Sequence, residues 1–487
     1  MINIPLVDDK VAFRLAGAMT KRDRYTTYQM TGKQIDGRDL WSLRASLRLE
    51  PTSWLRADFV YEHFQEHDDR LRSGKQLCKK DPGLSEVGGV SVNQDLGGYF
   101  GARTYLSQGC LPVSLYSDEA FQTPNGFALP FYGPTGNLGN PVFKDVDPYA
   151  SAFQSRDLRV IESSIEPEYR AKTDIFELQL NVDLSDTLTL SSETAYSTDS
   201  LFSTQDYNRF TTKSGAFDPT ARIVRPKRPG VLDANGVFCD PQLGCSDRLL
   251  LGDLSTAESK QFSQELRLSS DFDGPFNFSL GANYLRYKTE DRYYVFVNSL
   301  SMFAALQWDQ YAEGNVYIPG VSDNSECQSP TGAPPDPGGQ YTITNCIYID
   351  PNPIGSLNGE GRNYFLSRNP YTLHSYAAFG EAYYNITDNL KLTGGLRFTV
   401  DKKDAPQIPS WLLAGFATGE YPTAKVVSQK WSEPTGRIAI DWQPETGFTD
   451  HTLLYASFAR GYKAGGANPP PIALATYGQF DPSIIAE

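Results

Sequence analysis

The chain has 487 residues, a formal net charge of −14 and a pI of about 4.9. This acidic balance argues against nucleic acid as a partner, because such binding depends on Lys and Arg side chains that neutralise phosphates. Aromatic residues make up 13% of the chain, with 28 Tyr and 27 Phe against 4 Met, which favours strands over helices. No apolar run approaches the roughly 18 residues that a membrane helix needs. The length would suit about three ordinary domains or one large barrel.

Eleven stretches alternate between apolar and polar side chains, as strands with two different faces do. The clearest is 389–401, where Leu390, Leu392 and Leu396 fall on one side of an extended backbone and Lys391 falls on the other. The predicted strands, in chain order, are residues 10–20, 38–50, 54–64, 172–184, 187–197, 261–270, 276–287, 371–387, 389–401, 431–442 and 452–463.

The connections between these strands alternate in length. Short turns, such as residues 185–186 and 271–275, join the strands in pairs, whereas long segments join one pair to the next. The longest of these segments are residues 65–169 and 291–370. This asymmetry is typical of outer-membrane barrels, which have short periplasmic turns and long extracellular loops. We therefore predict an all-β fold, a transmembrane antiparallel β-barrel.

The charges decide which face of each strand meets lipid. If the strand at 389–401 were turned over, Lys391 and Arg397 would lie in lipid, at a cost of roughly 2–4 kcal/mol each near the bilayer midplane. A secreted β-sandwich that acts as a binding module would accept the same strands, since each sheet has one solvated face. It does not explain long loops at only one end. A passive porin is a third alternative.

Eleven strands cannot close a barrel, because bacterial single-chain barrels have an even number of strands and lipid tolerates no unpaired edge. The segment after Met1 has neither the basic nor the apolar region of a signal peptide. No closing strand follows residue 463 in this sequence. We therefore expect residues 1–487 to be an incomplete barrel domain from a larger protein.

Several segments resemble the barrel of a TonB-dependent outer-membrane receptor. They are HSYAAFGEAYYNITDNLKLTGGLRFTVDKKD at 374–404, WSEPTGRIAIDW at 431–442 and LYASFARGYKAGG at 454–466. The segment FSQELRLSSDFDGPFNFSLGANY at 262–284 is similar to a mid-barrel hairpin of that family. The resemblance covers residues 10–466.

The resemblance implies a barrel of about 22 strands with a plugged lumen, in the outer membrane of a Gram-negative bacterium. It implies contacts with outer-membrane lipid and lipopolysaccharide, and TonB-energised uptake of a large, scarce nutrient, most often a ferric siderophore. In this family TonB acts on an N-terminal plug that carries the TonB box. Neither the plug nor the last strands match a segment of this sequence.

The polar faces of the strands carry charged residues that we expect to face the lumen. They are Arg44, Arg48, Arg56, Glu62, Glu177, Glu265, Arg267, Lys391, Arg397, Glu433 and Arg437. These side chains either solvate the lumen and pair with one another or with the plug, or some of the arginines grip an anionic or catecholate substrate. A second candidate set could form an aromatic platform in the third long loop, belong to the aromatic girdle, or pack that loop on itself. Its members are Tyr293, Tyr294, Trp308, Tyr311 and Tyr317.

The six cysteines fall two to a loop in three different long loops. They are Cys78, Cys110, Cys239, Cys245, Cys327 and Cys346. Sequential pairing would give three disulfides on the exported side, with free thiols as the alternative.

No catalytic or metal-binding pattern stands out. His63 and His67 lie four residues apart, but they lack the His-Glu-x-x-His order of zinc proteases, and we interpret them as a strand end that runs into an acidic loop. A nucleophile elbow, a P-loop and a dinucleotide fingerprint are all missing from the sequence. We therefore predict a protein that is not an enzyme and has no cofactor.

Overall fold

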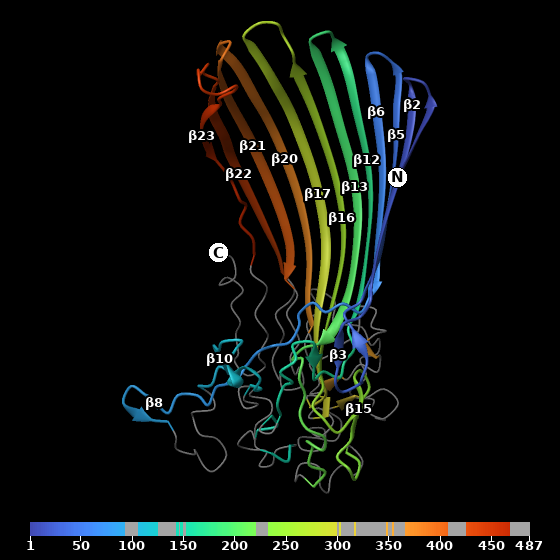
Figure 1. The fold of residues 1–487 in the computed structure, drawn as a ribbon, viewed down its shortest axis with the longest axis vertical. Helices are drawn as coiled ribbons and strands as arrows, with labels where there is room; N and C mark the ends of the chain where they lie inside the picture. The colour runs from blue at the N-terminus through green and yellow to red at the C-terminus, as the bar shows by residue number, and fades with distance from the viewer. Residues whose placement is uncertain are drawn as a thin grey trace.

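The computed structural model describes residues 1–92, 106–124, 143–145, 147–149, 152–220, 232–299, 301–302, 316–317, 347–348, 353–354, 366–407 and 425–467. Its main feature is a single antiparallel sheet of 12 strands, each paired with its neighbours along the chain (Figure 1). These strands are β1 (Ile2–Val7), β2 (Val11–Arg22), β5 (Arg38–Thr52), β6 (Leu55–Asp68), β12 (Glu168–Ser185), β13 (Leu188–Asp206), β16 (Leu251–Ser270), β17 (Phe276–Val297), β20 (Leu366–Thr387), β21 (Leu390–Gln407), β22 (Lys425–Trp442) and β23 (Leu454–Arg460).

The long loops carry short elements of their own. They are β3 (Thr26–Tyr28), β4 (Gln34–Ile35), β7 (Lys79–Lys80), β8 (Glu86–Val87), β9 (Val90–Ser91), β10 (Cys110–Leu111), the 3-10 helix η1 (Asp118–Ala120), β11 (Val160–Ile161), β14 (Phe238–Asp240), β15 (Gly244–Ser246), β18 (Val316–Tyr317) and β19 (Ile347–Tyr348). Within the described ranges, no helix is long and apolar enough to cross a membrane.

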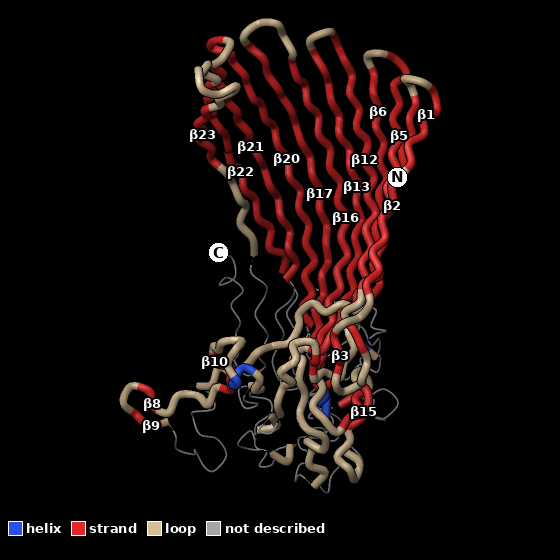
Figure 2. The backbone as a smooth tube through the Cα atoms, in the orientation of Figure 1, coloured by secondary structure: helices blue, strands red, loops and turns tan. Residues whose placement is uncertain are grey.

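The hairpin turns lie at one end of the sheet and the described parts of the long loops lie at the other (Figure 2). Asp388 and Asn389 are the only residues between β20 and β21, so the predicted tight hairpin is confirmed. The alternation of short turns and long loops is confirmed in the same way. We refer below to the turn end and the loop end of the sheet.

The large sheet has twelve strands in the described part of the chain, where the sequence predicted eleven, because β1 was not predicted. Pro5 interrupts the pattern of this strand and cannot donate a backbone hydrogen bond, but β1 is an edge strand, where proline is tolerated. Several strands also extend farther towards the loop end than predicted. β16 begins at Leu251 and β17 continues to Val297, because backbone pairing persists where the apolar alternation has stopped.

The two faces of the sheet differ as the alternation predicted. On one face large apolar side chains are exposed, and Leu396 is 76% exposed. On the other face Thr393, in the same strand, is 5% exposed, and Thr399 and Asp401 are also buried. We call these the apolar face and the polar face. A surface of exposed leucine and phenylalanine side chains suits lipid as its solvent and not water.

The sheet is curved and open. Its edge strands β1 and β23 each have one neighbour, β2 and β22, and they do not pair with each other among the described strands (Figure 1). The structure therefore contains part of a barrel. It contains one large sheet and not two packed sheets of similar size, so the β-sandwich alternative is not supported.

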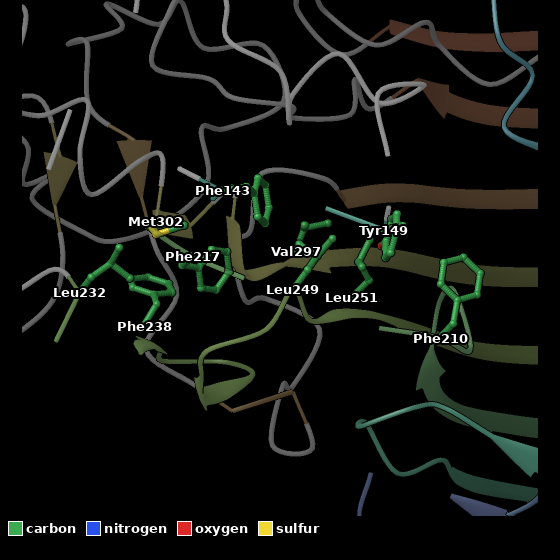
Figure 3. Close-up of a cluster of buried hydrophobic side chains, with 10 residues drawn as sticks. All are labelled: Phe143, Tyr149, Phe210, Phe217, Leu232, Phe238, Leu249, Leu251, Val297 and Met302. Atoms are coloured by element: carbon green, nitrogen blue, oxygen red, sulfur yellow. The ribbon is translucent and has the colours of Figure 1, made fainter. Parts of the chain in front are cut away.

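A conventional hydrophobic core occurs only at the loop end, among the described residues. Figure 3 shows this cluster, which joins side chains from three long loops to the ends of β16 and β17. Its members are Phe143, Tyr149, Phe210, Phe217, Leu232, Phe238, Leu249, Leu251, Val297 and Met302. The rings of Phe143 and Phe217 lie 5.2 Å apart, and those of Tyr149 and Phe210 meet edge to face. We call this part of the molecule the loop cap.

Candidate functional site

Most of the predicted lumen charges are neutralised by neighbours on the polar face. Arg48 Nε lies 2.7 Å from Asp58 Oδ1, and Arg44 Nη1 lies 3.8 Å from Glu62 Oε2. The remaining ion pairs on this face include Arg56 with Asp58, Arg267 with Glu265 and Arg437 with Glu381, and Glu433 pairs with Arg460 of the edge strand β23. These residues are partly exposed, so each pair contributes little to stability. The arrangement favours the interpretation that these charges solvate the lumen.

Two of the predicted arginines contact one aromatic ring. The guanidinium carbons of Arg267 and Arg397 lie 5.8 and 5.3 Å from the centroid of the Phe379 ring. Gly281 lies opposite Phe379, and a Cβ atom at Gly281 would come within 2.3 Å of the ring. Glycine is therefore required there for the ring to lie across β17. Lys391 makes a similar contact, at 4.8 Å, with the ring of Tyr383.

The predicted lumen set lies in the middle of the strands or towards the turns. Arg44 is eight positions from the end of β5 at Thr52, and Arg397 is seven positions from Leu390. Glu177 likewise lies eight positions from the end of β12 at Ser185. A ligand that arrives at the loop end would meet other side chains first.

Those other side chains form a group that the sequence analysis missed, which we call the loop-end cluster. It comprises Tyr287, Tyr371, Asp401, Lys403, Trp431 and Tyr462 on the polar face. The Tyr462 hydroxyl donates to Asp401 Oδ2 at 3.1 Å, and Lys403 Nζ lies 5.0 Å from the Trp431 ring centroid. The rings of Tyr287 and Tyr371 are 6.4 Å apart. Aromatic residues at polar-face positions were the signal that could have identified this cluster.

The described tyrosines of the proposed aromatic platform are partly or fully packed. Tyr294 is fully buried with Leu254 and Phe296, its ring 6.0 Å from that of Phe296. Tyr293 is half-buried, and its hydroxyl donates to Asp253 Oδ2 at 3.2 Å. Tyr294 therefore matches the alternative in which the loop packs on itself. Trp308 and Tyr311 lie outside the described residues. Tyr317 belongs to β18, and its side chain lies outside them too.

Buried charges fasten the loop cap to the strand ends. Arg72 pairs with Asp253 of β16, and the buried Lys75 Nζ lies 3.5 Å from Glu162 Oε2. Burial lowers the pKa of Lys75. Asp206, at the loop end of β13, accepts the backbone amides of Asn208 and Arg209 at 2.9 Å. Burial nevertheless raises the pKa of Asp206 to about 6, because the charged carboxylate loses its hydration.

Two of the three suggested cysteine pairs are joined. A disulfide links Cys78 to Cys110 within the first long loop, and another links Cys239 to Cys245 across the β14–β15 hairpin. Both lie in the loop cap, away from the exposed apolar face. Cys327 and Cys346 lie outside the described residues.

His63 and His67 lie on strand β6 and not on a helix. His63 Nδ1 is 2.7 Å from Asp174 Oδ1 on the neighbouring strand, and His67 Nε2 is 3.6 Å from Glu168 Oε1. No group of three or more potential metal-binding side chains occurs in the part of the chain that the structure describes. The histidines thus form cross-strand pairs at the loop end of the sheet.

Several solved structures resemble this chain at low sequence identity. The ferric yersiniabactin uptake receptor FyuA from Yersinia pestis has a TM-score of 0.48 and 12% sequence identity, over 97% of this chain and 45% of that one. The siderophore receptor PiuA from Acinetobacter baumannii has a TM-score of 0.46 and 13% sequence identity, over 94% of this chain and 46% of that one. This chain therefore spans about half the length of these solved structures. The copper transporter OprC gives a TM-score of 0.42 at 11% identity, over 92% and 40%.

No curated protein matches the sequence significantly. The family model described as TonB dependent receptor-like, beta-barrel matches residues 115–483, which is well over half of the chain. The matched region includes eight of the twelve strands of the large sheet, from β12 to β23. The chain therefore belongs to the family of TonB-dependent receptor-like β-barrels.

Proposed function

We propose that this chain forms part of an outer-membrane receptor of a Gram-negative bacterium that imports a large, scarce nutrient with energy from TonB. The observation that carries the proposal is the family match over residues 115–483. In the outer membrane, the hairpin turns of such a receptor would face the periplasm and the loop cap would face the outside of the cell. The family is one of receptors, so the proposed activity is binding and uptake and not catalysis.

The exposed apolar face supports a position within a bilayer. Leu396, Phe398 and Leu280 are all exposed on this face, where water would solvate them poorly and outer-membrane lipid would solvate them well. The polar face then lines a lumen, and its ion pairs tolerate water. TonB would act through a plug held against that face.

We further propose that the ligand class is a ferric siderophore. The support is chemical. The loop-end cluster presents aromatic rings, the Lys403 ammonium and hydroxyl groups on the polar face, at the end from which a ligand would enter. Cations and aromatic faces are the groups that recognise an anionic or catecholate iron complex.

Uptake by the host tests the proposed function. A strain that lacks the gene should take up radiolabelled iron from added ferric siderophores more slowly than the parent, and the intact gene should restore the rate. A proton uncoupler should abolish the restored uptake, because TonB depends on the proton gradient. Uptake that survives the uncoupler would instead indicate the passive porin alternative.

The ligand class has a separate test in the same strain. Tyr371→Ala and Lys403→Gln should each weaken binding of the transported siderophore by about tenfold, the size expected for a lost aromatic or cation–π contact. Tyr116→Ala is the matched control, since Tyr116 is exposed on the first long loop away from the cluster. Equal affinities for all three variants would remove the cluster from the binding site.

A further inference from the structure

One row of the polar face crosses four neighbouring strands and brings two arginines to one phenylalanine ring. Arg267 of β16 stands opposite Gly281 of β17, and Gly281 stands opposite Phe379 of β20. Arg397 of β21 completes the row, directly opposite Phe379. Neighbouring strands lie about 4.8 Å apart, so the row is about 14 Å wide. We call these four residues the mid-lumen row.

The Phe379 ring lies across the backbone of β17. A Cβ atom at Gly281 would come within 2.3 Å of the ring, so the ring occupies the space that a side chain would fill. The guanidinium carbons of Arg267 and Arg397 lie 5.8 and 5.3 Å from the ring centroid, and they come from the strands on the two sides. Phe379 is only half-buried. The row therefore presents an accessible aromatic ring with a cation on each side.

Arg397 has no counter-ion among the described residues. Its one hydrogen bond to a described side chain joins Nε to the Thr399 hydroxyl at 3.2 Å. Both terminal nitrogens of its guanidinium thus lack a described partner. On the next strand, by contrast, Arg437 donates to both carboxylate oxygens of Glu381. A half-buried guanidinium without a carboxylate can accept an anion from outside the protein.

Arg267 is only partly engaged. Its Nη2 lies 2.5 Å from Glu265 Oε1, and its side chain remains 49% exposed. The other nitrogens of this guanidinium form no hydrogen bond with a described residue. Arg267 can therefore keep its ion pair and still donate to a ligand that lies over the ring.

The mid-lumen row is separate from the loop-end cluster. Arg397 is six positions from Lys403 on the same face of β21, a separation of about 20 Å in an extended strand. Arg397 is also seven positions from the turn end of β21 at Leu390. A strand crosses a membrane in about 9–11 residues, so the row lies within the membrane-spanning part. A ligand at the row would already have moved well beyond the loop-end cluster.

We propose that the mid-lumen row is a second ligand site, at which an iron complex of the catecholate class binds on its way from the loop end to the turn end. The inference rests on the uptake function proposed above. A catecholate ring would stack on Phe379, and its negatively charged oxygens would accept from Arg397 and Arg267. A hydroxamate complex has no aromatic ring and carries less negative charge, so the row would favour catecholates over hydroxamates.

Transport kinetics in the deletion strain test this inference. The probes are radiolabelled iron bound to a tris-catecholate chelator and to a tris-hydroxamate chelator. Arg397→Gln should lower the maximal rate of catecholate-iron uptake about tenfold, the size expected for one charge-assisted hydrogen bond. Binding of the same probe to cells treated with the uncoupler should change by less than about twofold, because it reports the loop-end cluster.

Two further variants sharpen the test. Phe379→Leu keeps an apolar side chain but removes the ring, and it should also slow catecholate uptake without weakening binding to uncoupled cells. Arg14→Gln is the matched control, because Arg14 is an exposed arginine opposite Ser46 on the polar face of β2, far from the row in the strand order. Its uptake rate should equal that of the parent. The amount of each variant in the outer-membrane fraction verifies that it is folded.

The outcomes separate the second site from its alternatives. Slower catecholate uptake in Arg397→Gln and Phe379→Leu, with the control unchanged, supports the site. Parental rates in both variants would overturn it, and so would a parent that prefers the hydroxamate complex. Entry of a large hydrophilic antibiotic into uncoupled Arg397→Gln cells, but not into control cells, would show that Arg397 holds the plug, which also overturns the site. A parent that imports neither complex with energy would contradict the proposed function itself.

Discussion

The large sheet and the loop cap bury apolar side chains in opposite ways. In the sheet, the most apolar face is the most exposed, and Leu396 and Phe458 project from it. In the loop cap, Phe217 and Leu254 are fully enclosed by other side chains. One chain thus contains a part suited to lipid as its solvent and a part suited to water.

This contrast explains where the polar networks occur. Between its two edge strands, the sheet pairs the backbone of each strand with both neighbours, from β1 to β23. The loop cap has short strands, so it relies on side chains such as Asp206 and on buried ion pairs such as Arg72 with Asp253. Loss of a single side chain should therefore affect the loop cap more than the sheet.

The largest effect is expected for Phe217→Ala in the loop cap. Phe217 is 0% exposed, and its ring packs 5.2 Å from Phe143, so removal of the ring leaves a cavity that costs about 3–5 kcal/mol. Hydrogen exchange at the Ala216 amide, which donates to Asp247 O, measures the local opening. The control is Tyr116→Ala, at 92% exposure, with an expected change within about 0.5 kcal/mol. Unchanged exchange in Phe217→Ala would refute a cooperative cap.

The next effect concerns the apolar face and separates lipid from water directly. Leu396→Arg should cost roughly 2–4 kcal/mol in bilayers, because Leu396 is six positions from the turn end of β21 and so near the midplane. Leu453→Arg makes the same exchange at an exposed leucine in the turn before β23, outside the predicted hydrocarbon region, and should be nearly neutral. Urea unfolding from lipid vesicles gives both values. Equal costs would show that the two leucines share one solvent.

The third effect is a pH dependence confined to the loop cap. The folded-state pKa of Asp206, about 6, lies above its usual value of 3.8. The cap is therefore most stable below pH 3.8, and it loses this stability as the pH rises from 3.8 through 6. The loss at pH 7 is up to about 3 kcal/mol. Asp206→Asn keeps the acceptor oxygen and should remove the dependence. Hydrogen exchange of the Arg209 amide between pH 4 and 7, corrected for the intrinsic rate, measures it.

A second carboxylate, Asp233, serves as a control because its pKa shift has the opposite sign to that of Asp206. The Val237 amide donates to Asp233 Oδ1 at 2.8 Å and lowers the pKa of Asp233. This group stabilises the cap above its unfolded pKa, and the contribution is lost as the pH falls through the folded value. Asp233→Asn should therefore reduce stability at neutral pH, where Asp206→Asn increases it. Changes of the same sign in both variants would contradict the assignment of either group.

The sequence predicted the sheet well because a strand with one apolar and one polar face must keep a period of two. Leu390, Leu392 and Leu396 alternate with Lys391 and Thr393 for this reason, and the structure follows them. β1 was missed because Pro5 breaks the local pattern, and only the position of β1 at the sheet edge makes that proline harmless.

The loop cap could not be predicted in the same way. The contact of Phe143 with Phe217 joins residues 74 positions apart in two different loops, and nothing local to either residue indicates its partner. The loop-end cluster falls between these cases. Tyr287 and Tyr371 stood at polar positions of predicted strands, so an exception to the alternation was visible, but their contact with each other was not.

The smallest effect tests whether the polar face is wet. Arg437 and Glu381 form two hydrogen bonds, at 2.7 and 3.0 Å, and their side chains are 56% and 21% exposed. A double-mutant cycle of Arg437→Gln and Glu381→Gln in bilayers should give a coupling free energy of about 0.2–1 kcal/mol, as for ion pairs in water. A coupling of about 3 kcal/mol or more would mean that the polar face excludes water. The polar face would then resemble the buried loop cap, and the sheet would no longer be the wall of an aqueous lumen.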